Sequence, residues 1–544
     1  MCVQKWYNTC MKTIENTTLE EDDNIQLFHE KIETLETENH VLKHKLEKQD
    51  AKIREYEERI RLLTQQKFGP SRDKVVDGQI SLFNEAEKES AKKSVEPDLE
   101  EITYKRRKGQ SKTRKKYRDL EVEEVIYDLS DAEKVCPKCS SELHHMKYEV
   151  RKEFKYVPAT LKIVHHKKQV CACRNCDTNG TEGTIVSAKV PRPVLPGSLL
   201  SPSLLAILMD MKYNKMMPLY RQEKSFEELG IDIPRQNMAS WIIKGSEMYL
   251  KPLFNRLHFH LLQEDIIQAD ETVLNVLDEK DNKNNYMWLY ASAAHGTHQI
   301  FLYDYQKSRS GKNAKNFLLG FNGYLQTDGF KGYNKVENVV RLGCLAHCQR
   351  KYTDALKGLP KDADLSKTKV NEALKYLSTI FKLEEKFQDL SNDERYQKRL
   401  EKSKPVLDDF HKWLLLEKER TLPKSLLGKA ITYSLNQWDQ LVNFLSDGRL
   451  SCHNNRCEQR IKPFVLARKN FLFSKSPKGA TASGIVFSII ETAKANGLIA
   501  FNYLTYLFEK LPNIDLENYD ELDALLPWSN DLPDYLRPLK ESSE

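Results

Sequence analysis

The sequence predicts a multidomain α+β protein with an N-terminal coiled coil, a cysteine-rich module, a helical region and an α/β domain that carries a helical insertion. Three observations predict this class: a length of 544 residues, a heptad repeat near the N-terminus, and strand-like runs that begin near Glu264. At roughly 100 to 200 residues per domain, the length predicts about three or four domains. Hydrophobic residues make up 40% of the chain and charged residues 30%, which excludes global disorder. No run approaches the roughly 18 apolar residues of a membrane-spanning helix, so we expect a cytoplasmic protein without a membrane partner.

Charge is unevenly distributed along the chain. Basic and acidic residues number 85 and 79, which gives a net charge of +6. Residues 105–118 nevertheless hold nine basic residues and no acid, residues 456–479 hold seven basic residues and one acid, and residues 509–544 hold ten acids and three basic residues. Local basic segments predict contact with a polyanion. The alternative interpretation is a solvated linker for the first segment and a charged helix for the second.

Residues 25–63 predict a long coiled-coil helix. Mostly apolar residues recur in steps of three and four for more than five heptads, which is the pattern of a coiled-coil seam. Asn39 falls at an a position, where paired asparagines hydrogen-bond across a parallel dimer and fix its register. The alternative is a single long surface helix packed on its own domain. We assign residues 20–66 to a dimerisation helix, with Leu35, Asn39, Leu42 and Leu46 in the interface.

Two Cys-x-x-Cys pairs predict a structural zinc site. Each pair presents two thiolates from one tight turn, and four thiolates complete a tetrahedral Zn²⁺ site. A total of 11 cysteines in short paired spacings fits metal ligation in a reducing compartment better than disulfides. A redox role is less favoured, because no thioredoxin-like pattern surrounds either pair. We assign 67–118 to a linker and 119–190 to a zinc module, with the ligands Cys136, Cys139, Cys173 and Cys176.

Residues 191–258 predict a helical region of the helix-turn-helix type. Helical patterns cover 218–229 and 234–249, and Gly230 ends the first of them. In such a motif the second helix presents its first residues to the major groove of DNA. The spacing also fits an ordinary pair of packed helices. The residues at the start of the second helix are Arg235, Gln236 and Asn237.

From Glu264 onward the pattern becomes that of an α/β domain. Successive strands followed by mixed strand and helix predict a sheet with helices packed on it. The strand-like runs are 266–270, 286–293, 299–305, 323–327 and 339–344, with a helical stretch at 311–319. We assign 259–353 and 451–500 to this domain, 354–450 to a leucine-rich helical insertion, and 501–544 to an acidic C-terminal tail.

Three acids are candidates for a metal-dependent site. Asp270 ends an apolar run, Asp328 closes a second one, and Glu458 lies on a predicted helix among basic residues. Adjacent carboxylates repel and raise one another's pKa, and divalent cations remove the repulsion. Two Mg²⁺ (or Mn²⁺) held by carboxylates and a substrate phosphate would activate a water or a 3′-hydroxyl and stabilise the leaving oxygen. Because the chain has 79 acids, composition alone does not select this triple.

The segments around these acids resemble a known family. They are similar to the catalytic motifs of bacterial insertion-sequence transposases of the DDE type, in the insertion-sequence-sixty-six family. The C-terminal block comprises Asn454 to Pro463, Ala467 to Phe473, Gly479-Ala480 and Ser488 to Ala493. Gln268-Ala-Asp270-Glu-Thr272 resembles the first aspartate motif, Leu325 to Tyr333 the second, and Cys344 to Lys351 the Cys-x-x-His-x-x-Arg-Lys segment. Pro191-Arg-Pro193, Pro218 to Glu223 and Leu525 to Trp528 are also similar.

The resemblance covers nearly the whole chain and implies an RNase H-like catalytic domain with Asp270, Asp328 and Glu458 as metal ligands. The 130 residues that separate Asp328 from Glu458 leave room for the insertion. The implied activity is binding of the ends of an insertion sequence, nicking of the DNA there and transfer of the 3′-hydroxyl ends to target DNA. The implied partners are double-stranded DNA, a second copy of the chain or a larger synaptic assembly, and small accessory proteins of the same element.

Basic residues near Glu458 are expected to neutralise DNA phosphates without sequence preference. Arg309 and Lys312 are expected to do the same, with a solvated turn as the alternative. His347 lies in the segment that resembles the family's Cys-x-x-His pattern and is either a helper near the scissile phosphate or a structural histidine. Cys348 and Gln349 depart from the small or basic residues usual there, so no metal ligand is assigned in this segment. The expected phosphate contacts near Glu458 are Arg456, Arg460, Lys462, Arg468 and Lys469.

Two other classes of protein remain open at this point. One is a non-enzymatic regulator that binds DNA through its zipper and zinc finger, and the presence of all three acids argues against it. The other is a nuclease on the same fold that cuts DNA without joining it. A strand-transfer assay with pre-cut ends and Mg²⁺ separates the nuclease from a transposase, because only the transposase joins the ends covalently.

Overall fold

The computed structural model describes residues 2–68, 160–172, 185–279, 284–360 and 364–538. The chain divides into two compact units. Unit 1 comprises residues 1–82, 258–275 and 279–465, and unit 2 comprises residues 83–257, 276–278 and 466–544. The basic segment 105–118 and the predicted zinc ligands Cys136, Cys139, Cys173 and Cys176 lie outside the described residues.

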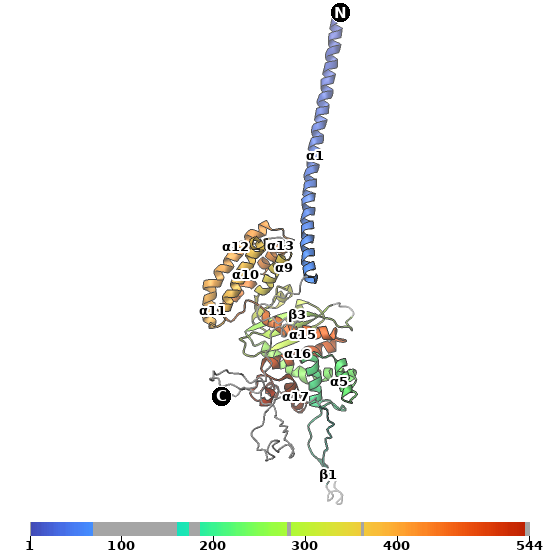
Figure 1. Cartoon of the computed structure of the whole chain (residues 1–544), viewed down its shortest axis with the longest axis vertical. Coiled ribbons are helices and arrows are strands. Elements are labelled where there is room, and N and C mark those ends of the chain that lie inside the picture. Colours follow the sequence, from blue (N-terminus) through green and yellow to red (C-terminus); the bar gives the residue numbers. More distant parts are fainter. Residues whose placement is uncertain (1, 69–159, 173–184, 280–283, 361–363, 539–544) are drawn as a thin grey trace, which may run out of the picture. The chain divides into compact units, whose positions relative to one another are not determined.

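Unit 1 begins with one long helix, α1 (Cys2–Phe68), which contains and extends the predicted helix 20–66 (Figure 1). Its last turns contact the helical insertion, because Arg61 Nε donates to the carbonyl of Gly358 at 2.9 Å and Glu58 accepts from the amide of Leu426 at 3.0 Å. The seam residues Leu42 and Leu46 are 59% and 62% exposed. No described part of the chain therefore covers this stretch of the seam.

The centre of unit 1 is a five-stranded mixed sheet in the order β5-β4-β3-β6-β7. The pairs β3–β4 and β4–β5 are antiparallel, whereas β3–β6 and β6–β7 are parallel. Because β3 and β6 are parallel and in register from Ile266 to Gln268, the chain just beyond the paired Gln268 and Gln326 runs in the same direction from neighbouring positions. The strands are β3 (Ile266–Leu274), β4 (Asn285–Ser292), β5 (Phe301–Gln306), β6 (Gly323–Gln326) and β7 (Val339–Leu342), with α8 (Gly311–Phe317) between β5 and β6.

All five predicted strand-like runs coincide with strands, but Asp270 does not end its strand. β3 continues to Leu274, and the register that pairs Asp270 with Leu289 goes on to pair Leu274 with Asn285. The polar residues Glu271 and Thr272 made the run appear to stop at Asp270. They belong to the strand because the antiparallel ladder with β4 satisfies their backbone groups whatever their side chains are.

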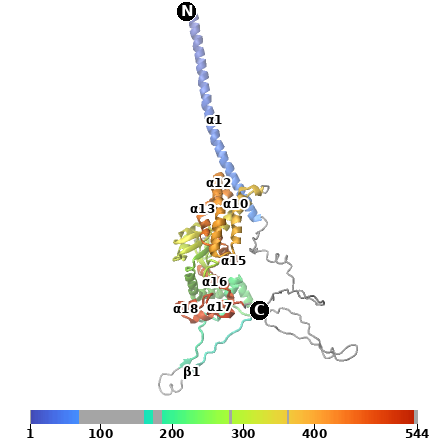
Figure 2. The ribbon, with the colours of Figure 1, turned by 90° about the vertical axis from the view of Figure 1, so that its left-hand side faces the viewer.

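The helical insertion follows β7 and packs as a bundle beside the sheet (Figures 1 and 2). It begins at Leu345, earlier than the predicted 354, because α9 starts directly after the last strand. Its buried core includes Tyr352, Leu377, Phe410 and Leu414 and is continuous with Leu342 at the end of β7. The helices are α9 (Leu345–Lys357), α10 (Lys369–Lys386), α11 (Asn392–Lys398), α12 (Lys404–Arg420), α13 (Leu426–Asn436) and α14 (Trp438–Val442).

After the insertion comes α15 (Asn455–Phe471), which runs across the boundary between the two units near residue 465. Its first part belongs to unit 1, where Cys457 is buried and the hydroxyl of Tyr303 on β5 donates to the carbonyl of Arg460. The predicted catalytic range 451–500 is therefore divided, since the residues from 466 onward belong to unit 2. The division reflects packing, because the next helix, α16, is buried among the helices of unit 2.

Unit 2 is mainly helical. α16 (Pro477–Ala495) buries residues on nearly all of its faces and contacts α6 and α17. The predicted acidic tail, 501–544, contributes α17, on which Tyr503, Leu504 and Leu507 are fully buried. Part of that segment thus belongs to the core of unit 2. The elements are β1 (Val170–Ala172), β2 (Ile185–Ser187), α4 (Pro202–Met209), α5 (Leu219–Glu228), α6 (Arg235–Gly245), α7 (Lys251–Leu261), which ends in unit 1, α16, α17 (Ala500–Lys510) and α18 (Tyr519–Asp523).

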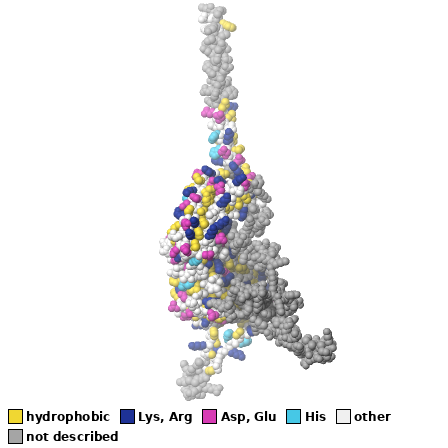
Figure 3. Space-filling view, turned by 60° about the vertical axis from the view of Figure 1, so that its left-hand side comes forward, with side chains coloured by type: hydrophobic (Ala, Val, Ile, Leu, Met, Phe, Trp, Pro, Cys, Tyr) yellow, Lys and Arg dark blue, Asp and Glu magenta, His cyan; other side chains and the backbone are white. Residues whose placement is uncertain are grey.

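Two surface properties complete the description. Among the described residues no single helix has the length and apolarity to cross a membrane, although Pro477–Ala495 together with Ala500–Asn513, bent by 119°, meets those two criteria. In the space-filling view, basic and acidic side chains are interspersed among the coloured residues (Figure 3).

Candidate active site

Two adjacent parallel strands carry the predicted aspartates to the same place. Gln268 of β3 is in register with Gln326 of β6, and each stands two positions before an aspartate, Asp270 and Asp328. Asp270 Oδ1 accepts from the amide of Glu271 at 2.9 Å, and Asp328 Oδ1 accepts from the amide of Phe330 at 2.9 Å. These bonds orient each carboxylate by its own local backbone.

The surroundings of Asp270 raise its pKa. Burial, the largest cause, acts together with the negative charges of Glu271, Asp328 and Glu458 to raise this pKa from 3.8 to about 8. Burial removes the water that would stabilise the carboxylate, and nearby anions make its ionisation still less favourable. A cluster of carboxylates that repel one another fits a hard divalent cation, because the cation binds oxygen ligands and its positive charge offsets the repulsion.

Glu458 reaches the cluster from the first turn of α15. The residue that precedes this helix, Asn454, is fully buried. Its side-chain amide donates to the carbonyl of Ala269 at 3.0 Å, and its backbone amide donates to Cys344 Sγ at 3.3 Å. Asn454 thus ties the start of the glutamate helix to the strand position next to Asp270.

A buried set of amide side chains, which we call the amide ladder, connects the three parts of the site. It consists of Gln268, Gln326 and Asn454, which are at most 3% exposed. Gln268 Nε2 donates to Gln326 Oε1 at 2.6 Å, and Gln326 Nε2 donates to the carbonyl of Ser451 at 2.6 Å. The ladder was not predicted, although both glutamines precede an aspartate by two residues, which is a pattern visible in the sequence.

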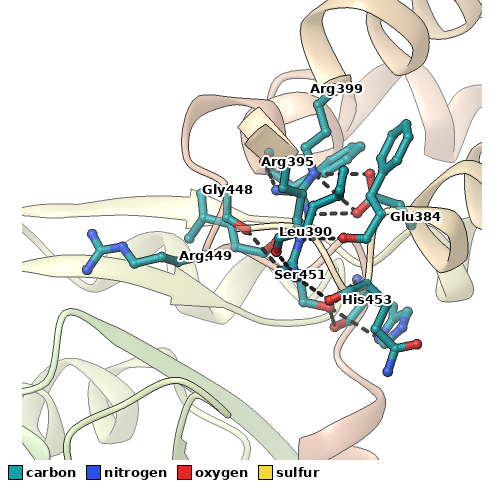
Figure 4. Close-up of polar contacts among 12 residues, drawn as sticks. Glu384, Leu390, Arg395, Arg399, Gly448, Arg449, Ser451 and His453 are labelled. Atoms are coloured by element: carbon teal, nitrogen blue, oxygen red, sulfur yellow. Dashed lines mark hydrogen bonds and ion pairs between the residues drawn. The ribbon is translucent and has the colours of Figure 1, made fainter. Parts of the chain in front are cut away.

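The insertion holds the segment that leads to Glu458 (Figure 4). Arg399 is 1% exposed and forms a forked ion pair with Glu384, in which Nη2 lies 2.6 Å from Oε2. Its guanidinium also donates to the carbonyls of Phe444, Asp447 and Leu450. Because a buried arginine needs all its donors satisfied, these bonds fix the path of the chain shortly before Ser451.

A fourth acid, Glu271, is the neighbour of Asp270 in the chain and forms an ion pair and a hydrogen bond of its own. Arg309 Nη2 lies 2.5 Å from Glu271 Oε1, and the hydroxyl of Tyr333 donates to Glu271 Oε2 at 2.5 Å. Arg309 also lies 3.9 Å from Asp328 Oδ2 and stacks over the ring of Phe330 at 4.1 Å. Arg309, expected to contact DNA, thus neutralises acids of the site in this structure, whereas Lys312 is exposed.

His347 stands beside Glu458. Its Nδ1 lies 3.5 Å from Glu458 Oε1, while Arg350 Nη2 lies 3.3 Å from Glu458 Oε2. Burial lowers the pKa of His347 in spite of the nearby Glu458 carboxylate. The imidazole is therefore neutral near pH 7 and reaches the glutamate as a neutral ligand or hydrogen-bonding group.

The side chains that are predicted to contact DNA differ in their exposure to solvent. Arg456 is turned inward, since its guanidinium donates to the carbonyl of Ser292 at 3.2 Å and to Gln299 and lies over the ring of Phe301. Arg460 lies over the same ring at 4.7 Å. Arg468 and Lys462 are partly buried and Lys469 is exposed, as are Arg235, Gln236 and Asn237 at the start of α6.

The turn before α6 has the geometry that the sequence indicated. Gly230 adopts a φ of +79° after the end of α5, a conformation that residues with a side chain rarely adopt. The backbone amide of Arg235 is capped by Glu223 Oε1 at 2.8 Å. These contacts leave the first three side chains of α6 pointing to solvent.

Comparison with known proteins identifies three matching segments. Residues 197–482 match the Transposase IS66 family, residues 488–528 match the IS66 C-terminal element, and residues 133–177 match the zinc-finger binding domain of transposase IS66. The third segment spans all four cysteines of the two Cys-x-x-Cys pairs, which supports structural Zn²⁺.

Three proteins of Sinorhizobium fredii are similar over most of their length. Uncharacterized protein y4jD is 29% identical over 73% of this chain and 78% of its own. Uncharacterized protein y4hP is 26% identical over 75% of both chains, and uncharacterized protein y4qI is 27% identical over 69% of both. Since the family match covers more than half of the residues, this chain belongs to the IS66 family of transposases.

Proposed function

We propose that this transposase binds the ends of its insertion sequence, nicks the DNA there and transfers the 3′-hydroxyl ends to target DNA at a site built from Asp270, Asp328 and Glu458. The observation that carries the proposal is the hydrogen-bonded linkage of the three segments that bear the acids. Gln268 of β3 bonds to Gln326 of β6, and Asn454, which precedes α15, bonds to the carbonyl of Ala269 beside Asp270. The sheet order supports an RNase H-like assignment, because three antiparallel strands followed by two parallel ones describe that fold.

The carboxylates have the task of holding two Mg²⁺ (or Mn²⁺). When bound, these ions activate a water or a 3′-hydroxyl and stabilise the leaving oxygen. Asp270 would hold the cations as a carboxylate, because their charge would outweigh the repulsion from the neighbouring acids. Glu271 stays paired with Arg309 and Tyr333, so it supports the position of Asp270 without competing for the cations.

The remaining modules would bind DNA and assemble the subunits. The exposed side chains at the start of α6 would enter a major groove, and the zinc-finger domain would add a second contact to the element's ends. Lys462 and Lys469 would neutralise phosphates near the glutamate helix. The exposed seam of α1 would pair with a second copy of the chain, which gives a dimer or a larger synaptic assembly, with accessory proteins of the element as further partners.

Strand transfer with pre-cut element ends and Mg²⁺ tests the proposal. We expect Asp270→Ala, Asp328→Ala and Glu458→Ala each to lower joining by at least about a hundredfold, because each removes a ligand whose charge is needed in the transition state. DNA binding, measured by gel shift, should persist. Glu337→Ala is the matched control, since this acid is 70% exposed and pairs with Lys315 rather than with a residue of the site.

Two outcomes would overturn the proposal in different ways. If all three variants join DNA as well as the unmodified protein while Cys136→Ser abolishes binding, the chain is a DNA-binding regulator. If the unmodified protein releases cut ends without joining them, it is a nuclease. The assay separates these classes, because joined products are longer than the substrate and cut products are shorter.

A further inference from the structure

One group of side chains at the edge of the site carries donors of a different kind from the aspartates. The Sγ of Cys344, a ring nitrogen of His347 and a carboxylate oxygen of Glu458 all lie within 4.8 Å of one another. Cys344 caps the N-terminus of α9, His347 lies in its first turn, and Glu458 lies in the first turn of α15. Two helix starts therefore present a sulfur, a nitrogen and an oxygen to one point.

Two of these donor atoms are buried and face only each other. His347 Nδ1 and Glu458 Oε1 face each other at 3.5 Å, and neither has a hydrogen-bond partner among the described residues. The other oxygen of Glu458 is occupied by Arg350. Buried acceptors without a donor are costly, and a cation between the two atoms would satisfy both.

The sulfur decides which cation fits. Cys344 is fully buried, which raises the pKa of its thiol, while the amide of Asn454 donates a hydrogen bond to Sγ and opposes this shift. A bound cation would supply the positive charge that a buried thiolate needs. Thiolate and imidazole ligands favour Zn²⁺ and related cations, whereas Mg²⁺ prefers oxygen ligands alone. A donor set of one sulfur, one nitrogen and one oxygen therefore matches a thiophilic divalent cation and leaves a fourth position for water.

We propose that Cys344, His347 and Glu458 form a second metal site, specific for a thiophilic divalent cation such as Zn²⁺ and separate from the four-cysteine zinc module. When the cation binds, the S–H bond of Cys344 breaks, a bond from Sγ to the metal forms, and the proton passes to solvent. A consequence, which rests on the proposed function, is that a filled site withdraws Glu458 from the two aspartates and holds the transposase inactive.

Cobalt titration of the full-length protein, purified with zinc in its zinc module, tests the site. Co²⁺ bound to a thiolate gives a charge-transfer absorption band in the near ultraviolet. We expect the unmodified protein to develop this band with release of a proton, and Cys344→Ser to lack that part of the band. Cys348→Ser is the matched control, because Cys348 lies on the same helix, is equally buried and bonds to Ser434 instead.

A second variant keeps the test decisive if Cys344→Ser folds poorly. His347→Ala changes a less buried residue and should weaken cobalt binding by about tenfold or more, while its far-ultraviolet circular dichroism stays unchanged. Any cobalt that enters the zinc module contributes equally to all three proteins and cancels in the difference spectra. A band of equal size in Cys344→Ser and in the unmodified protein would overturn the proposed site.

The cobalt result is independent of strand transfer. If Glu458→Ala still joins DNA, the proposed function is wrong, but the loss of the band in Cys344→Ser would still establish the metal site. If Glu458→Ala is inactive and the band does not depend on Cys344, the catalytic proposal stands and the second metal site is absent.

Discussion

Gln268 donates its side-chain amide to Gln326 across 2.6 Å, and each of these glutamines precedes an aspartate of the site by two residues. The two residues are also in register between parallel strands. One buried hydrogen bond therefore fixes the positions of Asp270 and Asp328 relative to each other along the strand direction. The same Gln326 reaches the carbonyl of Ser451, so the strand pair and the segment before Glu458 share one hydrogen-bonded residue.

Removing that shared residue should affect both stability and joining. We expect Gln326→Ala to lower the free energy of unfolding by about 1–3 kcal/mol, because it leaves buried polar partners unsatisfied. Strand transfer should fall more than DNA affinity does, since the carboxylates lose their alignment. Gln397→Ala, at an exposed position on α11, should change stability by less than about 0.5 kcal/mol. Equal behaviour of the two variants in chemical denaturation would contradict this role.

The buried arginine of the insertion should be a strong determinant of stability. We expect Arg399→Met to cost about 3–5 kcal/mol, because it leaves Glu384 and three carbonyl groups without their donor. Arg399→Lys should recover only part of this loss, since an ammonium group cannot form the forked pair. Arg420→Met is the control, with a side chain that is 71% exposed. Thermal unfolding measures all three, and a small effect of Arg399→Met would show that the insertion does not depend on this residue.

The raised pKa of Asp270 predicts how stability depends on pH in metal-free protein. The folded chain holds this proton up to about pH 8, whereas the ordinary value is 3.8. The contribution to stability is therefore complete below about pH 4 and is lost as the pH rises through 8. We expect Asp270→Asn, which cannot ionise, to be more stable than the unmodified protein at pH 9 by about 1–3 kcal/mol.

Added Mg²⁺ should reverse this order, because it stabilises only the chain that has the Asp270 carboxylate. Asp389→Asn, which changes an exposed acid, should follow the unmodified protein at every pH. If denaturation curves of Asp270→Asn and of the unmodified protein shift in parallel between pH 5 and pH 9, Asp270 does not titrate in this range.

The exposed seam of α1 predicts a dimer in solution. Leu35→Glu combined with Leu42→Glu should give a monomer, because the two charges would meet their counterparts at the centre of the interface. Asn39→Val should keep the protein associated but relax its register or number of strands. His44→Glu, on the exposed outer side of the helix, should leave the molar mass unchanged. Light scattering after size-exclusion chromatography gives the mass, and a monomeric unmodified protein would contradict the prediction.

The sequence was most informative where local pattern dictates structure. The strand runs, the long helix and the turn at Gly230 follow from the period of apolar residues and from backbone preference. The sequence was misleading at Asp270, because polar Glu271 and Thr272 belong to β3 through their backbone pairing. It was also misleading after residue 500, where a count of acids conceals the buried positions Tyr503 and Leu504.

Contacts between distant residues could not be predicted in this way. Arg309 pairs with Glu271, 38 positions earlier, and Gln326 pairs with Ser451, 125 positions later. No periodicity links such residues, since only the folded sheet and insertion bring them together. The three acids were found by resemblance to family motifs, whereas the amide ladder and Arg399 became visible only through the structure.

The insertion also delays the synthesis of the third acid of the site relative to the first two. Asp270 and Asp328 are synthesised with or directly after the strands β3 and β6. Glu458 is synthesised 130 residues after Asp328. At roughly 5–20 residues per second this interval lasts about 6–26 seconds. The contacts of Arg399 with the carbonyls of Phe444 and Leu450, before Ser451, also form only after this interval. If the proposed function holds, a chain truncated before Glu458 would have two of the three carboxylates and would not cut DNA.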